Sequence, residues 1–147
     1  MAYRTIAIIC DQPIQDAIAS GTIYPGMALE RTSTDDTVQP HSTEDGKVAA
    51  GLIAVEDELQ GNGITTVYTA DNRVLFRSFL PGDEANLKIA LGQNIAIGDK
   101  LTSNGDGYFK KLVNDSSSAD MDKTHFATAK EASNCLAAVG FCRAEIA

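Results

Sequence analysis

Apolar and polar residues alternate in several short runs along this chain, as they do in strands that bury one face. The alternation is clearest in segments 5–10, 87–91 and 141–146. Their apolar members are Ile6, Ile8 and Cys10; Leu87, Ile89 and Leu91; and Cys142, Ala144 and Ile146. We therefore predict a strand in each segment, with the intervening residues on the opposite face.

Short apolar runs between turns predict further strands at 27–31, 51–55, 73–80 and 108–112. Turns are marked by Tyr24-Pro25-Gly26, Pro81-Gly82 and Asn104-Gly105-Asp106-Gly107. Segment 15–20 is ambiguous, because Ile14, Ala17 and Ile18 have helical spacing but the segment lacks good caps. Residues 32–46 and 114–123 are polar, which predicts a surface excursion and a loop.

Many short strands at close intervals predict an all-β fold. We expect a small single-domain β-barrel or β-sandwich (β-tulip-like), with at most a short helix. The 147 residues correspond to one ordinary domain, and no internal repeat is apparent. Within it we predict an N-terminal strand or arm at residues 1–10 and a β-domain at residues 11–147.

Charge and composition exclude several partners. The net charge is −8, whereas nucleic-acid binding requires a basic surface that neutralises phosphates. No apolar run approaches the roughly 20 residues that a membrane helix needs. The three cysteines are an odd number without a Cys-x-x-Cys pair, which favours free thiols over a disulfide framework or a zinc site. We expect no nucleic-acid and no membrane partner.

The titratable residues form no recognisable catalytic or metal-binding pattern. His41 and His125 lie in separate polar stretches, so we expect both at the surface. The acidic run Glu56-Asp57-Glu58 is expected to be a solvated face in so acidic a chain, and Cys135 a small buried residue. No nucleophile elbow, phosphate-binding loop or zinc-protease motif occurs. The prediction is therefore no catalytic, cofactor-binding or metal-binding residues and no enzyme.

Four segments together resemble one protein family, the small decoration (cement) proteins of tailed-bacteriophage capsids. They are 11–27 (DQPIQDAIASGTIYPGM), 52–74 (from LIAVEDELQG to DNRV), 81–84 (PGDE) and 92–107 (from GQNIAIGDKL to GDG). The four segments follow one another in the family's order and spacing, and the stretch that contains them spans about two thirds of the chain. The N-terminal residues and the C-terminal segment carry little of the resemblance.

The resemblance implies a structural virion protein without catalytic residues. Such a protein binds the outer capsid surface where neighbouring major capsid subunits meet, and it stabilises the shell. The implied partners are the phage major capsid protein and the chain itself, as a homotrimer. The implied site of synthesis is the cytoplasm of the bacterial host.

We place the capsid contact in the N-terminal arm, because an apolar terminal segment needs something to cover it. The residues concerned are Ala2, Tyr3, Arg4, Thr5, Ile6, Ala7, Ile8 and Ile9. Addition of this strand to an exposed capsid edge would supply backbone hydrogen bonds. The alternative is that Ile6 and Ile8 complete the core of their own domain.

Three other functions would each need features of their own in the sequence. A small trimeric β-fold enzyme would need clustered Asp, Ser and Tyr motifs that the sequence lacks. A carrier module would present a modified lysine on a tight hairpin, but Lys100 has the wrong neighbours for that role. A carbohydrate-binding module is disfavoured by the absence of Trp, the usual platform for stacking on sugars.

Overall fold

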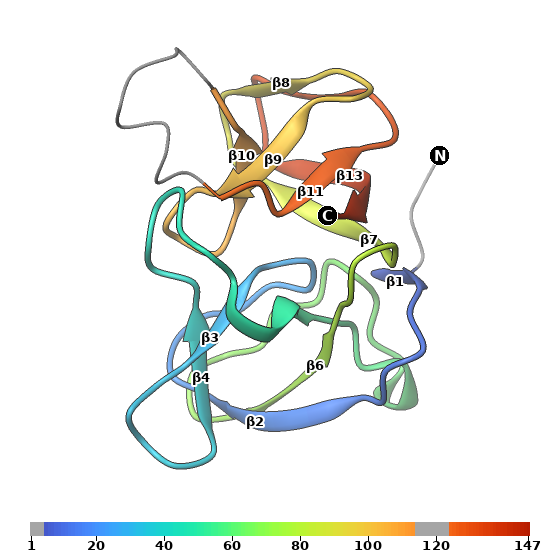
Figure 1. The fold of residues 1–147 in the computed structure, drawn as a ribbon. Coiled ribbons are helices and arrows are strands. Elements are labelled where there is room, and N and C mark those ends of the chain that lie inside the picture. The colour runs from blue at the N-terminus through green and yellow to red at the C-terminus, as the bar shows by residue number, and fades with distance from the viewer. Residues whose placement is uncertain (1–4, 114–123) are drawn as a thin grey trace.

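The computed structural model describes residues 5–113 and 124–147, which form two small β-barrels (Figure 1). The N-terminal barrel, blue to green in Figure 1, has the strand order β3-β4-β2-β6-β5. Its strands are β2 (Gln15–Ala19), β3 (Leu29–Arg31), β4 (Thr37–Pro40), β5 (Leu52–Ala54) and β6 (Arg73–Ser78). A bridge between Ala28 and Ile53 joins the two edges of this sheet and nearly closes it.

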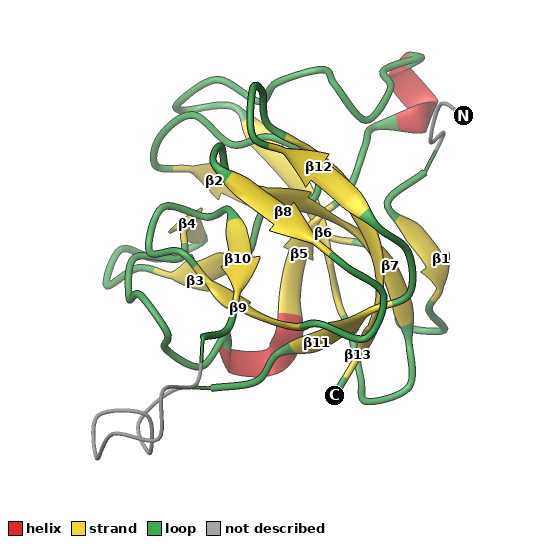
Figure 2. Ribbon diagram, turned by 90° about the horizontal axis from the view of Figure 1, so that it is seen from above, coloured by secondary structure: helices red, strands yellow, loops and turns green. Residues whose placement is uncertain are grey.

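The C-terminal barrel is closed by β7, which pairs with β10 on one side and β13 on the other. Its strands are β7 (Glu84–Ile89), β9 (Lys100–Ser103), β10 (Phe109–Lys111), β11 (Ala127–Ala129) and β13 (Gly140–Ile146). The first strand, β1 (Ala7–Ile9), pairs antiparallel with the start of β7. A separate ribbon of β8 (Gln93–Ile95) and β12 (Ser133–Cys135) lies across this barrel (Figure 2).

The two barrels share apolar packing. One buried cluster fills the N-terminal barrel around Phe76 and Val74. The other fills the C-terminal barrel and extends to Ile53 and Phe79 of the N-terminal half. Within it the rings of Phe109 and Phe126 stack with their centroids 5.1 Å apart. Because this second cluster includes residues of both halves, it holds the two barrels together.

The all-β prediction is confirmed. In the described residues the helical elements are two single 3₁₀ turns, η1 (Ala49–Gly51) and η2 (Glu58–Gln60). The ambiguous segment 15–20 is strand β2, in which Ala17 and Ala19 are buried and Ile14 before it is exposed. The strands expected at 27–31, 51–55, 73–80 and 108–112 are all present, within these limits. No described helix is long and apolar enough to cross a membrane.

The excursion expected at 32–46 is only partly correct, because it contains β4 with Val38 fully buried. The loop expected at 114–123 lies outside the described residues. The predicted hairpin turn is confirmed: residues 104–107 lie in the connection between β9 and β10, and Gly107 has a φ of +88°. A Cβ at Gly107 would lie 2.9 Å from Pro40 Cβ. Both the positive φ and this close approach therefore require glycine at the position.

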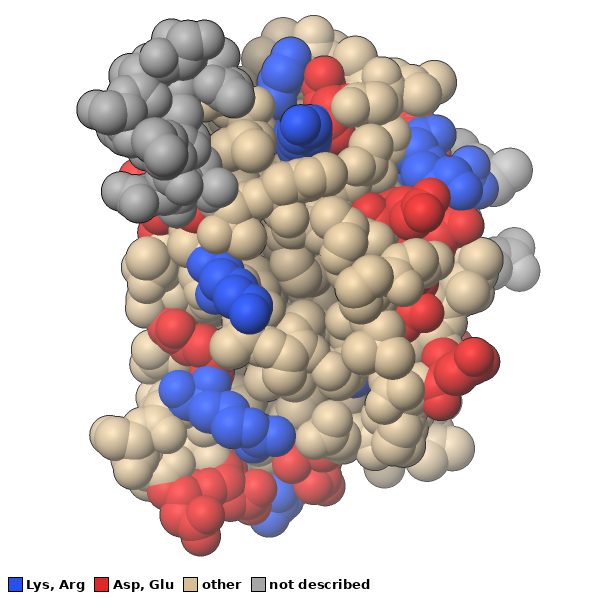
Figure 3. Space-filling view, in the orientation of Figure 1, with Lys and Arg blue, Asp and Glu red and all other residues tan. Residues whose placement is uncertain are grey.

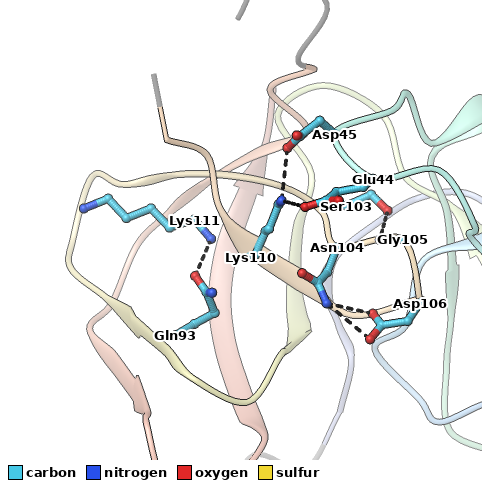
Figure 4. A network of polar contacts seen from close by, with 9 residues as sticks. All are labelled: Glu44, Asp45, Gln93, Ser103, Asn104, Gly105, Asp106, Lys110 and Lys111. Atoms are coloured by element: carbon cyan, nitrogen blue, oxygen red, sulfur yellow. Dashed lines mark hydrogen bonds and ion pairs between the residues drawn. The ribbon is translucent and has the colours of Figure 1, made fainter. Parts of the chain in front are cut away.

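Polar contacts fasten this hairpin to its surroundings (Figure 4). Asn104 donates to both carboxylate oxygens of Asp106 at 3.2 Å, inside the turn. Lys110 on β10 pairs with Glu44 and, at 3.5 Å, with Asp45. The last residues of the polar excursion are therefore held against the C-terminal barrel.

Strand β7 departs from the one-sided burial that its sequence predicts. Lys88 is buried on the face opposite Leu87 and Ile89, whereas Leu91, expected inside, is 61% exposed. The backbone of Gly26 accepts from Lys88 N–H, so the turn at 24–26 covers the outer face of β7. The prediction fails because that cover comes from a segment some 60 residues earlier in the chain.

Candidate functional site

The structure divides the predicted capsid-contact residues into three groups. Ala2, Tyr3 and Arg4 lie outside the described residues. Ile6 is fully buried in the core, and Thr5 and Ala7 are half-buried. Ile8 and Ile9 are exposed, at 37% and 51%. The alternative use of Ile6 in the core of its own domain is thus what the structure shows, whereas the expected inward alternation at Ile8 is wrong.

A register irregularity explains the exposure of Ile8. Ala7 pairs with Ala85, yet Ile9 pairs with Glu84, so β1 advances two residues while β7 advances one. Such a bulge leaves one residue of the bulged strand without a partner opposite it and turns its side chain away from the regular alternation. Ile8 is that residue.

Glu56 anchors the start of β1. Its carboxylate accepts a 3.0 Å hydrogen bond from Ile6 N–H, and its residue is only 6% exposed. On the other side, Asn86 Nδ2 donates to Thr5 O at 2.7 Å. The expectation that residues 56–58 form a solvated face is therefore wrong for Glu56, because a buried backbone N–H requires an acceptor there.

A groove of about 430 Å³ lies between β1 and the segment that follows β5. We call it the β1 groove; η2 lies beside it, near the N-terminal strand in Figure 2. Its apolar lining includes Ile8, Ile14, Leu59 and Leu75. Leu59, at the centre of η2, is 95% exposed and Ile14 is 51% exposed. Contiguous exposed apolar side chains of this kind mark surfaces that bind other molecules.

Acidic residues border the β1 groove. Asp57 and Glu58 are on its lining with the anchored Glu56, whereas Arg77 is the one basic residue among the described residues of the lining. The Arg77 guanidinium donates to Cys10 O and Gln12 O, both at 3.3 Å, so it holds the chain after β1. Figure 3 shows acidic side chains along the edge on which β1 lies in Figure 1. The groove therefore favours an apolar partner segment that also carries a basic residue.

Tyr68 holds Val55, which lines the β1 groove next to these acidic residues. Its hydroxyl donates a 2.6 Å hydrogen bond to Val55 O. Burial raises the pKa of Tyr68 to about 12, and the negative charges of Asp57 and Glu56 add to the rise. The phenol is therefore neutral and a hydrogen-bond donor throughout the physiological range.

The titratable residues singled out in the sequence occupy other positions. His41, expected at the surface, is buried: Nε2 donates to Lys47 O at 2.9 Å and Nδ1 lies 2.7 Å from Ser103 Oγ. His125 is half-buried and lies 2.9 Å from Thr128 Oγ1. Both histidines thus make hydrogen bonds within the fold, and no group of three or more potential metal ligands occurs in residues 5–113 and 124–147.

All three cysteines are free thiols. Cys135 is buried, as expected, and so is Cys142. Burial raises the pKa of Cys142 to about 12, so this thiol is protonated at neutral pH and is a poor nucleophile.

No family model matches the sequence, and no curated protein is significantly similar to it. Among solved structures, the N base of the head fiber gp8.5 in bacteriophage phi29 has a similar fold. The TM-score is 0.58 at 15% sequence identity, and the similarity covers 92% of this chain and 94% of that chain. The two chains therefore share a fold along nearly their whole lengths.

The sequence did not single out Leu59 or Ile14 as surface residues of a groove. A signal was present for Leu59, which is a single large apolar residue between Glu58 and Gln60, directly before a glycine-rich turn. An apolar residue in so polar a turn has no strand or helix face to join. No such signal exists for Ile14, because its helical spacing with Ile18 is equally consistent with a buried position on a helix.

Proposed function

We propose that this chain is a structural protein of a phage virion, which binds the outer capsid surface at junctions of major capsid subunits and stabilises the shell. The observation that carries the proposal is the fold shared with the N base of a bacteriophage head fiber over 92% of this chain. The sequence resemblance to capsid decoration proteins supports it independently. The proposal assigns no catalytic residue and no cofactor.

The β1 groove and the N-terminal residues form the proposed contact with the major capsid protein. Ile6 is excluded from it by burial, which leaves Ala2, Tyr3, Arg4, Thr5, Ala7, Ile8 and Ile9. In the described part of the chain, β1 pairs only with β7, so its second edge can receive a strand. A capsid segment bound there would place apolar side chains over Ile8 and Leu59 and a basic one near Glu58.

The resemblance further supports assembly as a homotrimer on the shell. Three linked copies would bind with an avidity well above that of one copy, because the second and third contacts form at high effective concentration. Synthesis in the cytoplasm of the bacterial host accords with three free thiols. A surface with a net charge of −8 would be repelled by the packaged genome.

Co-sedimentation tests the proposal. The purified chain is mixed either with expanded, DNA-filled capsids or with the free major capsid protein of the same phage. We expect the chain to pellet with the capsids in a saturable manner and to leave the free subunits unbound. A chain that stays in the supernatant at all capsid concentrations would refute the proposal.

A further inference from the structure

Lys88 on β7 is a buried cation that has no carboxylate partner in the described part of the chain. It is 6% exposed and is the one Lys or Arg in the described ranges that is buried. Its Nζ lies 4.9 Å from the ring centroid of Tyr24 and 4.6 Å from that of Phe141. Other cations of the chain have acidic partners, among them Arg73 with Asp36, Lys110 with Asp45 and Lys130 with Glu84.

The two rings replace only part of the hydration that the ammonium loses on burial. Burial accordingly lowers the pKa of Lys88 below its usual 10.5, and the Cys135 thiol opposes this shift in part. The chain contains 20 acidic residues against 12 basic ones. Carboxylates are thus abundant, yet none in residues 5–113 and 124–147 forms an ion pair with its most buried lysine.

The ammonium is nevertheless not sealed inside the protein. In the described residues, the fully buried side-chain atoms without a hydrogen-bond partner are Asn86 Oδ1 and Thr102 Oγ1, and Lys88 Nζ is not among them. Tyr24 and Phe141 are themselves half-buried. Lys88 Nζ therefore keeps some contact with solvent beside these two rings.

We propose that Lys88, Tyr24 and Phe141 form a receptor for one Asp or Glu side chain of a partner protein. A single ammonium flanked by aromatic rings matches the one negative charge and the short apolar side-chain carbons of an Asp or Glu. A polyanion, in contrast, would be repelled by the net charge of −8. Docking would give the buried cation the counter-charge it lacks, in a site already shielded from water. The identification of the partner as the major capsid protein rests on the proposed function.

A titration without capsids tests the site itself. The pKa of Lys88 is measured through its side-chain nitrogen resonance in increasing sodium acetate, and in sodium chloride of equal ionic strength. We expect acetate to raise the pKa in a saturable manner, because a bound carboxylate stabilises the charged amine. Equal pKa values in the two salts at every concentration would overturn the proposal.

Capsid binding then tests the partner, with two variants that make the same chemical change. Lys88→Met removes the buried ammonium and keeps an apolar chain of similar length, whereas Lys100→Met removes an exposed one on β9. We expect capsid affinity to fall about tenfold or more for Lys88→Met and to change by less than about twofold for Lys100→Met. Equal affinities of the two variants would overturn the assignment of this site to capsid binding.

Thermal unfolding establishes that each variant is folded. If Lys88→Met is unfolded, Lys88→Gln replaces it, because glutamine keeps a polar end without a charge. Failure of the unaltered chain to bind capsids would refute the proposed function alone. The acetate titration would then decide the carboxylate site by itself.

Discussion

The backbone N–H of Ile6 donates to the carboxylate of Glu56, 50 residues away in sequence, over 3.0 Å. This bond connects the N-terminal strand to the segment after β5, and both groups are buried. It fixes the position of β1 and, with it, one wall of the β1 groove.

Substitution of Glu56 should therefore weaken the fold. Glu56→Ala leaves Ile6 N–H buried without an acceptor, which lowers the free energy of unfolding by about 1–3 kcal/mol. Glu56→Gln keeps an acceptor oxygen and should lose less. Chemical denaturation at neutral pH measures both. The control is Glu58→Ala at an exposed position, which should change stability by at most about 0.5 kcal/mol; a loss as large as that of Glu56→Ala would contradict this role.

Two truncations separate folding from binding at the N-terminus. Removal of residues 1–9 deletes the buried Ile6 and β1, and should lower the free energy of unfolding by at least about 2–5 kcal/mol. Removal of residues 1–4 keeps the Ile6–Glu56 bond, so the unfolding midpoint should stay unchanged. Capsid co-sedimentation of this shorter truncation should be weaker if Ala2, Tyr3 and Arg4 contact the shell. Undiminished binding would remove those three residues from the contact.

A charge placed in the β1 groove should weaken capsid binding without unfolding the protein. Leu59 is 95% exposed, so Leu59→Asp should change stability by no more than about 0.5 kcal/mol. We expect it to weaken capsid affinity at least about tenfold, equivalent to about 1.4 kcal/mol. Leu136→Asp, at a 57% exposed position outside the groove lining, is the matched control. Equal binding by the two variants would show that the groove is not the contact.

The raised pKa of Tyr68 implies that the free energy of unfolding falls in alkaline solution. The pKa of this phenol is raised from 10.0 to about 12 in the folded state, so its stabilising contribution is complete below pH 10 and disappears as the pH rises through 12. Tyr68→Phe should be less stable than the unaltered chain at neutral pH, because it loses the bond to Val55 O. The difference between the two proteins should shrink between pH 10 and 12. A constant difference across that range in denaturant titrations would contradict the raised pKa.

Local sequence patterns were sufficient to predict most strands and the β9–β10 turn. In β13, Cys142, Ala144 and Ile146 are buried and the residues between them exposed, as their alternation indicates. The glycines at 105 and 107 identify the hairpin because their positive φ angles are a local requirement. Such features depend on neighbours in sequence, and the sequence contains that information.

Burial of polar residues could not be predicted in the same way. His41 bonds to Ser103 across 62 positions, and Lys88 is covered by a ring from the turn at 24–26. Each is polar in its own segment and is buried only because a distant segment packs over it. The β1 groove is likewise assembled from β1, β6 and η2, and no local pattern relates those segments.

The most direct test of a role on the shell is an electron cryo-microscopy reconstruction of the virion that contains this chain. We predict density for both barrels on the outer capsid surface, grouped in threes where major capsid subunits meet, with the β1 groove against the shell. Density for this fold only inside the shell or on the tail, or its absence from the virion, would contradict that role.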